Sequence, residues 1–135
     1  MKSFTDIEQS KKLAEILPLE SADMFYEEVC NLPKAIVGNY ILHNQCMEDR
    51  DYKKLSNPVL SPAWSLAALL EQLDDEITDD NGNDYNLTIV KESLQYQLYY
   101  HDSWGQVEDI ETNYYDDLVD ACYEMIINLH EQKLL

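Results

Sequence analysis

The last third of the chain constrains the fold most, because two different apolar periods follow one another there. From Leu94 to His101, apolar and polar residues alternate, which is typical of a strand with one buried face. From about Asp116 to Gln132, apolar residues recur at steps of three and four, the pattern of a helix that packs against a sheet. The apolar positions of this helix are Leu118, Val119, Cys122, Met125, Ile126 and Leu129. Together the two periods predict a half-buried sheet followed by a helix that packs on it.

Further strands are predicted on both sides of the alternating segment. Residues 85–91 and 106–111 have the composition of strands. Turn residues at Ser93 and in 102–105 separate them from the alternating strand, which predicts a three-stranded antiparallel meander. Two more extended segments, rich in Val, Ile, Tyr and Phe, are predicted at 25–31 and 34–43.

The first helix is predicted from its capping residues. The Thr5 hydroxyl can accept from the amide of Glu8 while the Glu8 carboxylate reaches back, which forms a capping box. The helix then extends to about Leu17, because Pro18 lacks a backbone donor and disfavours helix at the residue before it.

A second helix start is indicated by Ser61 and Pro62, because Ser is favoured at the N-cap and Pro at the first helical position. The helix that follows, from Ala63 to Leu73, is apolar around more than one stripe. Its broad apolar surface needs cover from other elements or from a second copy, so a homodimer is one prediction. In total, the elements predict an α+β fold with three helices packed on an antiparallel sheet.

Length and charge limit the classes of function. The chain has 135 residues without repeats or linkers, which predicts a single domain over residues 1–135. It contains 27 acidic and 9 basic residues, and 17 of the acids but only two of the bases follow residue 67. Such charge excludes direct nucleic-acid binding and disfavours anionic membranes. No apolar run is long enough to span a membrane and no signal peptide is present, so we expect a cytoplasmic protein.

The acidic C-terminal half supplies the candidate partner-binding residues. Residues 102–124 contain eight acids and no Lys or Arg, and such a field attracts a basic protein surface. We therefore predict a noncatalytic protein-interaction module, with nucleic-acid mimicry as a sharper form if the carboxylates are spaced along one surface. Trp104, at a turn, is the aromatic candidate. The partner-binding candidates are Trp104, Glu108, Asp109, Glu111, Asp116, Asp117 and Asp120.

Metal binding is the alternative function for the acids of residues 71–84, because crowded carboxylates attract hard cations such as calcium. An EF-hand is excluded, since with Gly82 at the sixth loop position the first ligand would be Ile77. The simpler interpretation is a solvated helix end followed by an Asn81–Gly82 turn. The weak calcium candidates are Asp79, Asp80 and Asp84.

Cysteine and histidine residues do not complete a recognisable site. Cys30, His43 and Cys46 have a spacing that zinc could use, but no second pair supplies the remaining ligand, and Cys122 is predicted to lie in the core. His101, Asp102 and Ser103 are the residue types of a hydrolase triad. Sequence neighbours do not face one another in triad geometry, and no nucleophile elbow is present. We therefore predict no cofactor and no catalytic residue.

The chain is also rich in tyrosine, with ten Tyr against two Phe. Tyrosine is enriched where an apolar ring meets a wet edge, as at interfaces, but a sheet core with outward hydroxyls has the same composition. A tyrosine-rich sheet could also bind a small ligand. The aromatic group comprises Tyr96, Tyr99, Tyr100, Trp104, Tyr114, Tyr115 and Tyr123.

Three segments, residues 4–13, 62–71 and 120–127, together with Glu20 to Met24, carry a resemblance to other sequences. They resemble a family of small uncharacterised acidic proteins from Bacteroides-type gut bacteria and their phages or mobile elements. The resemblance covers nearly the whole chain and implies a single domain in the cytoplasm. It implies no activity, cofactor or catalytic residue.

Overall fold

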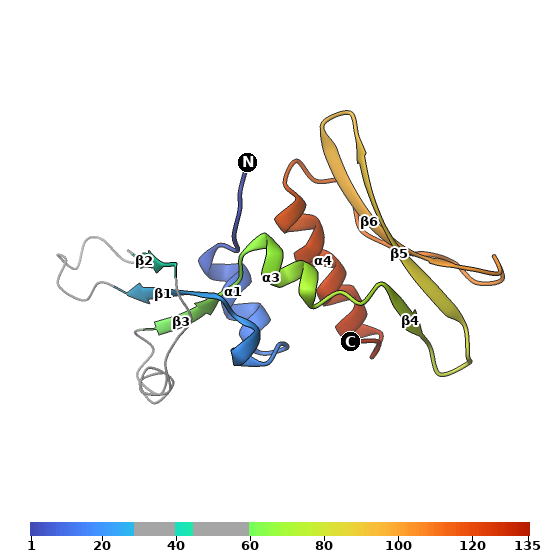
Figure 1. Ribbon diagram of the computed structural model, residues 1–135, viewed down its shortest axis with the longest axis horizontal. Coiled ribbons are helices and arrows are strands. Elements are labelled where there is room, and N and C mark those ends of the chain that lie inside the picture. Colours follow the sequence, from blue (N-terminus) through green and yellow to red (C-terminus); the bar gives the residue numbers. More distant parts are fainter. Residues whose placement is uncertain (29–39, 45–59) are drawn as a thin grey trace. The chain divides into compact units, whose positions relative to one another are not determined.

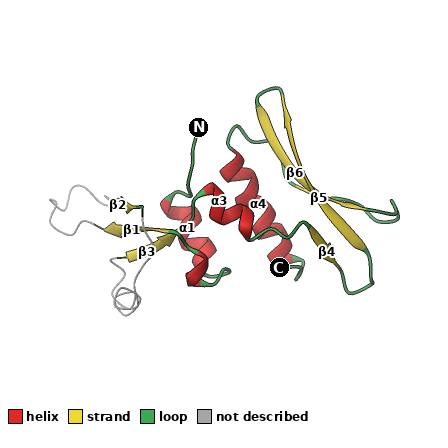
Figure 2. Cartoon of the chain, viewed as in Figure 1, coloured by secondary structure: helices red, strands yellow, loops and turns green. Residues whose placement is uncertain are grey.

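The computed structural model describes residues 1–28, 40–44 and 60–135, and it has an α+β structure with two antiparallel sheets (Figure 2). The chain divides into two compact units. We call Phe4–Ala68 the N-terminal unit, and Met1–Ser3 together with Leu69–Leu135 the C-terminal unit. The predicted α+β class is confirmed, but the strands lie in two sheets where one was expected. The single domain over residues 1–135 stays a prediction.

The N-terminal unit contains a three-stranded antiparallel sheet in the order β2-β1-β3, and α1 contacts β3. Its elements are α1 (Ile7–Ala14), the short 3-10 helix η1 (Leu19–Ser21), β1 (Met24–Glu28), β2 (Tyr40–His43) and β3 (Leu60–Ala63). The strands predicted at 25–31 and 34–43 correspond to β1 and β2 in their described parts. Their remaining residues lie outside the described part of the chain. Helix α3 (Leu66–Glu71) begins in this unit and ends in the next.

The cap of α1 lies one residue later than predicted. The Asp6 carboxylate accepts from the amide of Gln9 at 2.9 Å, and the Gln9 side chain accepts from the Asp6 amide at 3.2 Å. Thr5 is fully buried instead: its hydroxyl lies 2.7 Å from that of Ser10 and accepts from the Trp64 amide at 3.1 Å. Thr5 therefore connects α1 to the end of β3 and does not cap the helix.

The predicted helix start at Ser61 and Pro62 is wrong, because both residues belong to β3. Pro62 is opposite Phe25 in the ladder between β1 and β3. β3 is at the edge of its sheet, where a strand tolerates a residue without a backbone N–H. Helix α3 starts later, with the Ser65 hydroxyl accepting from the Ala68 amide at 3.2 Å as an N-cap does.

The apolar surface that motivated a homodimer is covered in part: Leu66 and Leu70 are half-buried and Ala67 is exposed. Ala68, Leu69 and Leu73 are at most 5% exposed, and Ala63 is fully buried. Their burial leaves a smaller apolar surface on this segment than the sequence predicts. The homodimer stays a prediction.

The C-terminal unit contains a four-stranded sheet in the order β4-β5-β6-β7, in which every neighbouring pair is antiparallel. Its elements are β4 (Glu76–Thr78), β5 (Asp84–Glu92), β6 (Gln95–Asp102), β7 (Ile110–Glu111) and α4 (Leu118–Glu131). β5, β6 and α4 agree with the predicted elements. β4 was not predicted, and β7 is shorter than the predicted strand at 106–111. Helix α4 contacts β6, and Figure 1 shows the two elements side by side.

Alternation along β6 places two of its side chains in the core of this unit. Leu98 and Tyr100 are fully buried on one face, whereas Gln97 and Tyr99 are half-buried on the other. Helix α4 adds six buried residues to the core, Val119, Ala121, Cys122, Met125, Ile126 and Leu129. Burial raises the pKa of Cys122 to about 12, so the thiol stays neutral as a core side chain. Within the described parts of the chain, no helix has the length and apolar character needed to span a membrane.

Candidate protein-binding site

The loop between β6 and β7 is held by the buried side chain of Asp102. One carboxylate oxygen accepts from the amide of Trp104 at 3.1 Å, and the other accepts from Gln106 at 2.7 Å and Val107 at 3.0 Å. Asp102 is 1% exposed, and its pKa lies below the ordinary value of 3.8, chiefly because the Trp104 amide stabilises the charged form. Gly105, with a φ of +65°, donates to the Asp102 carbonyl and closes the turn. The Asp102 carboxylate thus binds three of the backbone amides of this loop.

Trp104 in this loop is exposed to solvent, and so are the acidic side chains that follow it in the sequence. The indole of Trp104 is 79% exposed, and Glu108, Asp109 and Glu111 are exposed as well. Asp109 Oδ1 lies 2.9 Å from Nδ1 of His101, and no Lys or Arg occurs from residue 102 to 111. In Figure 1 the loop is part of the orange segment that follows β6. We call Trp104, Glu108, Asp109 and Glu111 the loop cluster.

The other three predicted acids lie at the start of α4, where each has a partner. Asp117 is the N-cap residue of α4 and accepts from the backbone amide of Lys2 at 2.8 Å. The Lys2 ammonium lies 2.7 Å from an oxygen of Asp120. Asp116 accepts from Nε2 of Gln95 at 3.1 Å. Lys2 therefore offsets part of the negative charge at this helix end, which also favours acidic side chains through its dipole.

The predicted acids form two groups. Gln95, the first residue of β6, binds Asp116, whereas Asp102, its last residue, holds the loop cluster. A strand of this length separates its two ends by about 23 Å. Asp109, bound to His101, thus lies near one end of β6 and Asp116 near the other, whereas Glu111 in β7 is opposite Tyr99 in the middle of the strand. Trp104 lies at the end of β6 away from Asp116, so a local contact around Trp104 is the simpler site.

Two acids of the predicted calcium site, Asp79 and Asp84, accept hydrogen bonds from neighbouring protein groups. Asp79 Oδ1 accepts from the amides of Asn81 and Asn83, each at 2.9 Å, and Oδ2 accepts from the Asn83 side chain at 2.8 Å. The Asn83 side chain contributes most to a lowered pKa of Asp79. Asp80 is exposed, and Asp84 is half-buried at the start of β5. In the described part of the chain, no three His, Cys, Asp or Glu side chains are arranged to hold a metal ion.

The zinc candidates are only partly described. Cys30 and Cys46 lie outside the described residues. The third candidate, His43, has Nε2 at 2.8 Å from a carboxylate oxygen of Glu27, and its ring stacks on that of Phe25 with centres 4.5 Å apart. His43 is thus held in the sheet by an acid and an aromatic ring from β1.

The three residues with the types of a hydrolase triad have separate partners. His101 is paired with Asp109, and the Asp102 carboxylate faces the backbone amides of its own loop. The Ser103 hydroxyl accepts from the side-chain amide of Asn86 at 2.6 Å. Through these contacts, all three residues stabilise the turn between β6 and β7 or the strands beside it.

The aromatic group is divided between core and surface. Tyr100 donates to the carbonyl of Asp74 at 2.6 Å, and burial raises its pKa. Burial also raises the pKa of Tyr115, which forms a backbone bridge with Tyr96. Of the remainder, Tyr114 is 46% exposed, and Tyr99 and Tyr123 are half-buried. Trp104 is the only one of the seven that is more than half exposed.

The structural role of Asp102 was missed by the sequence analysis, which counted it as a triad type and as one of many acids. The signal that could have found it is local. An Asp at the start of a turn that contains Gly three residues later commonly binds the amides that follow it. Comparison with protein-family models, with curated proteins and with solved structures finds no match for this chain. The functional argument therefore depends on the geometry of the sites.

Proposed function

We propose that this protein is a noncatalytic interaction module that binds a basic protein surface through the loop cluster. In this proposal Trp104 is the apolar anchor, and Glu108, Asp109 and Glu111 supply the charge around it. The observation that carries the proposal is an indole ring that is 79% exposed on a loop whose backbone is held by buried Asp102. A loop that is ordered before binding loses less conformational entropy on association.

The physical chemistry of interfaces supports these roles. Tryptophan is among the residues that contribute most to binding when a partner covers it and excludes water. The C-terminal unit has 17 acidic residues and three basic ones, Lys2, Lys91 and Lys133, so its net charge is −14. Such a field speeds the encounter with a positively charged partner, and salt weakens it.

The setting of this activity is part of the proposal. A nucleic-acid-binding protein is the class of partner that we favour, because its binding surface is basic. The resemblance to small acidic proteins of Bacteroides-type gut bacteria supports an accessory product of a phage or mobile element that acts in the cytoplasm. Nucleic-acid mimicry would be the form of this function in which the partner's nucleic-acid site is blocked.

The experiment is affinity capture with matched variants. The full chain is immobilised, lysate of the source organism is passed over it at low and at high salt, and retained proteins are identified by mass spectrometry. We expect one basic protein to be retained at low salt and released at high salt. With that protein purified, Trp104→Ala should bind about 30-fold more weakly, since loss of an anchoring tryptophan costs about 2 kcal/mol.

Charge reversals provide the control. Glu108→Lys and Glu131→Lys change the net charge equally, and both side chains are exposed in the C-terminal unit, but Glu131 is the last residue of α4. Glu108→Lys should weaken binding clearly more than Glu131→Lys. Wild-type affinity in Trp104→Ala, or equal losses in the two reversals, would contradict a site at the loop cluster.

A further inference from the structure

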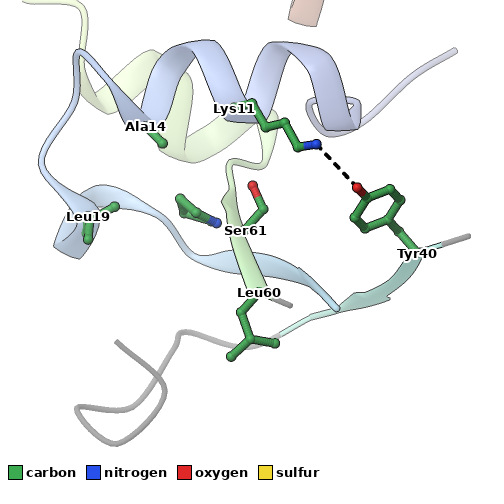
Figure 3. A pocket seen from close by; sticks show the side chains of 7 residues that line it. Lys11, Ala14, Leu19, Tyr40, Leu60 and Ser61 are labelled. Carbon is green, nitrogen blue, oxygen red and sulfur yellow. Dashed lines mark hydrogen bonds between the residues drawn. The ribbon is translucent and has the colours of Figure 1, made fainter. Parts of the chain in front are cut away.

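The N-terminal unit contains a pocket that the proposed function does not use. It lies between α1, η1, β2 and β3 and has a volume of about 360 Å³ (Figure 3). Pockets for small molecules commonly measure roughly 300–1,000 Å³ and combine apolar walls with a few polar groups. The apolar part of this wall consists of Ala14, Leu19, Leu60 and Pro62.

Three polar side chains complete the lining. Lys11 Nζ lies 3.2 Å from the hydroxyl of Tyr40 and 5.5 Å from the centre of its ring. Figure 3 shows the Lys11 ammonium pointing toward Tyr40, and the hydroxyl of Ser61 pointing from β3 toward α1. The pocket therefore has a polar part, with one cation and two hydroxyls, and an apolar part. This combination suits a ligand that has one polar end and one apolar end.

The charge of Lys11 determines the sign of that polar end. Among the described residues, no carboxylate forms an ion pair with Lys11. Its neighbour Lys12, in contrast, lies 3.3 Å from Glu15. Within the described residues, the hydrogen-bond partner of Lys11 is a hydroxyl, that of Tyr40, and not a carboxylate. A carboxylate would accept hydrogen bonds from both groups, and hydrogen bonds to charged partners are stronger than those between neutral groups.

We propose that this pocket binds a small amphipathic carboxylate. Lys11 and Tyr40 hold the carboxylate, and the apolar tail lies against Ala14, Leu19 and Pro62. The N-terminal unit has ten acidic and six basic residues in its sequence, a net charge of −4 against −14 for the C-terminal unit. Repulsion of an anionic ligand is therefore weaker at this unit than at the other. The site does not depend on the proposed partner binding.

The experiment is a titration of the isotope-labelled full chain with octanoate, followed by NMR, with octanol as the uncharged probe of equal chain length. We expect saturable shifts at Ala14, Leu19 and Leu60 with octanoate and binding at least about tenfold weaker with octanol. Lys11→Met keeps the apolar stem and removes the charge, so it should weaken octanoate binding about tenfold or more. Lys12→Met, one position along α1, should bind octanoate as wild type does.

Each result of this titration either supports or contradicts the proposal. A smaller loss in Tyr40→Phe, which removes only the hydroxyl, would support the proposal. Octanol binding as tightly as octanoate would overturn the carboxylate assignment. Equal weakening by Lys11→Met and Lys12→Met, shifts confined to residues away from the pocket, or no saturable shift at all would overturn the site itself. Because Lys11 and Lys12 are both exposed, neither substitution disturbs the core.

Discussion

Acidic residues in this chain differ in what they do, and their hydrogen bonds separate them. A buried carboxylate that accepts several backbone amides is part of its turn, because each amide would otherwise lose a partner on leaving water. Buried Asp102 accepts from three amides in this way, and half-buried Asp79 accepts from two. Glu108 on the same loop and Glu111 in β7, by contrast, have exposed side chains. Acidity in the C-terminal half therefore combines structural carboxylates with surface charge.

The role of Asp102 predicts a specific dependence on pH. Its pKa is lowered in the folded state, so its stabilising contribution is present above the ordinary value of 3.8 and is lost as pH falls through the lower folded pKa. Asp102→Asn keeps the shape and removes the charge. We expect this variant to melt at a lower temperature than wild type at pH 7, with a smaller difference near pH 3, in calorimetry at both pH values.

A matched control for this substitution is Asp109→Asn. Asp109 lies on the same loop, but its side chain is exposed and its partner is His101 rather than backbone amides. We expect a melting temperature close to that of wild type at neutral pH. A difference between wild type and Asp102→Asn that is unchanged by acid would mean that the lost stability does not come from the charge of Asp102.

At the scale of elements, the hairpin of β5 and β6 has an unusual turn. Ser93 and Leu94 have φ values of +51° and +65°, and they connect the paired residues Glu92 and Gln95. A two-residue turn with both residues in this region normally contains Asn and Gly, because other residues are strained there. Leu94 is also 82% exposed, so its side chain contributes little packing in return.

Leu94→Gly should therefore stabilise the protein. Relief of the left-handed conformation should raise the free energy of unfolding by about 1 kcal/mol, after allowance for the greater entropy of glycine in the unfolded chain. Urea denaturation measures the difference. Leu94→Ala removes the exposed side chain without relieving the backbone and should change stability little. Equal stabilisation by both variants would attribute the effect to the side chain instead.

Elements that follow from local patterns were predicted from the sequence, and those set by distant partners were not. The apolar period of α4 and the alternation of β6 are visible within single windows, so their bounds agree with prediction to within two residues. Ser61 and Pro62 are compatible with the start of a helix and equally with an edge strand. The choice depends on pairing with Phe25 and its neighbours in β1, which no local pattern reports.

The candidate sites differ in the same way. Trp104 and the acids after it were predicted, because composition along one loop is readable from the sequence. The separation of Trp104 from Asp116 depends on which ends of β6 these two residues meet, and this pairing is not visible in the sequence. The pocket beside Lys11 was not predicted at all, since α1, η1, β2 and β3 each contribute to it from separate parts of the chain.

At the scale of the whole molecule, charge is shared unequally between the units, at −14 and −4. Like charges on one compact unit repel one another, so the negative charge that attracts a basic partner also destabilises the fold of the C-terminal unit. Salt shortens the range of both effects, to about 10 Å at 0.1 M ionic strength. The same screening must therefore act with opposite signs on stability and on partner binding.

We accordingly expect added NaCl to raise the melting temperature of the free protein, by roughly 4 °C for each kcal/mol of repulsion that is screened. Differential scanning calorimetry over a salt series measures it, and KCl at equal ionic strength should have the same effect, since screening does not depend on the cation. A different response to the two salts would indicate binding of a specific cation. A melting temperature that falls with salt would mean that attractive charge pairs, such as Lys2 with Asp120, outweigh the repulsion in this unit.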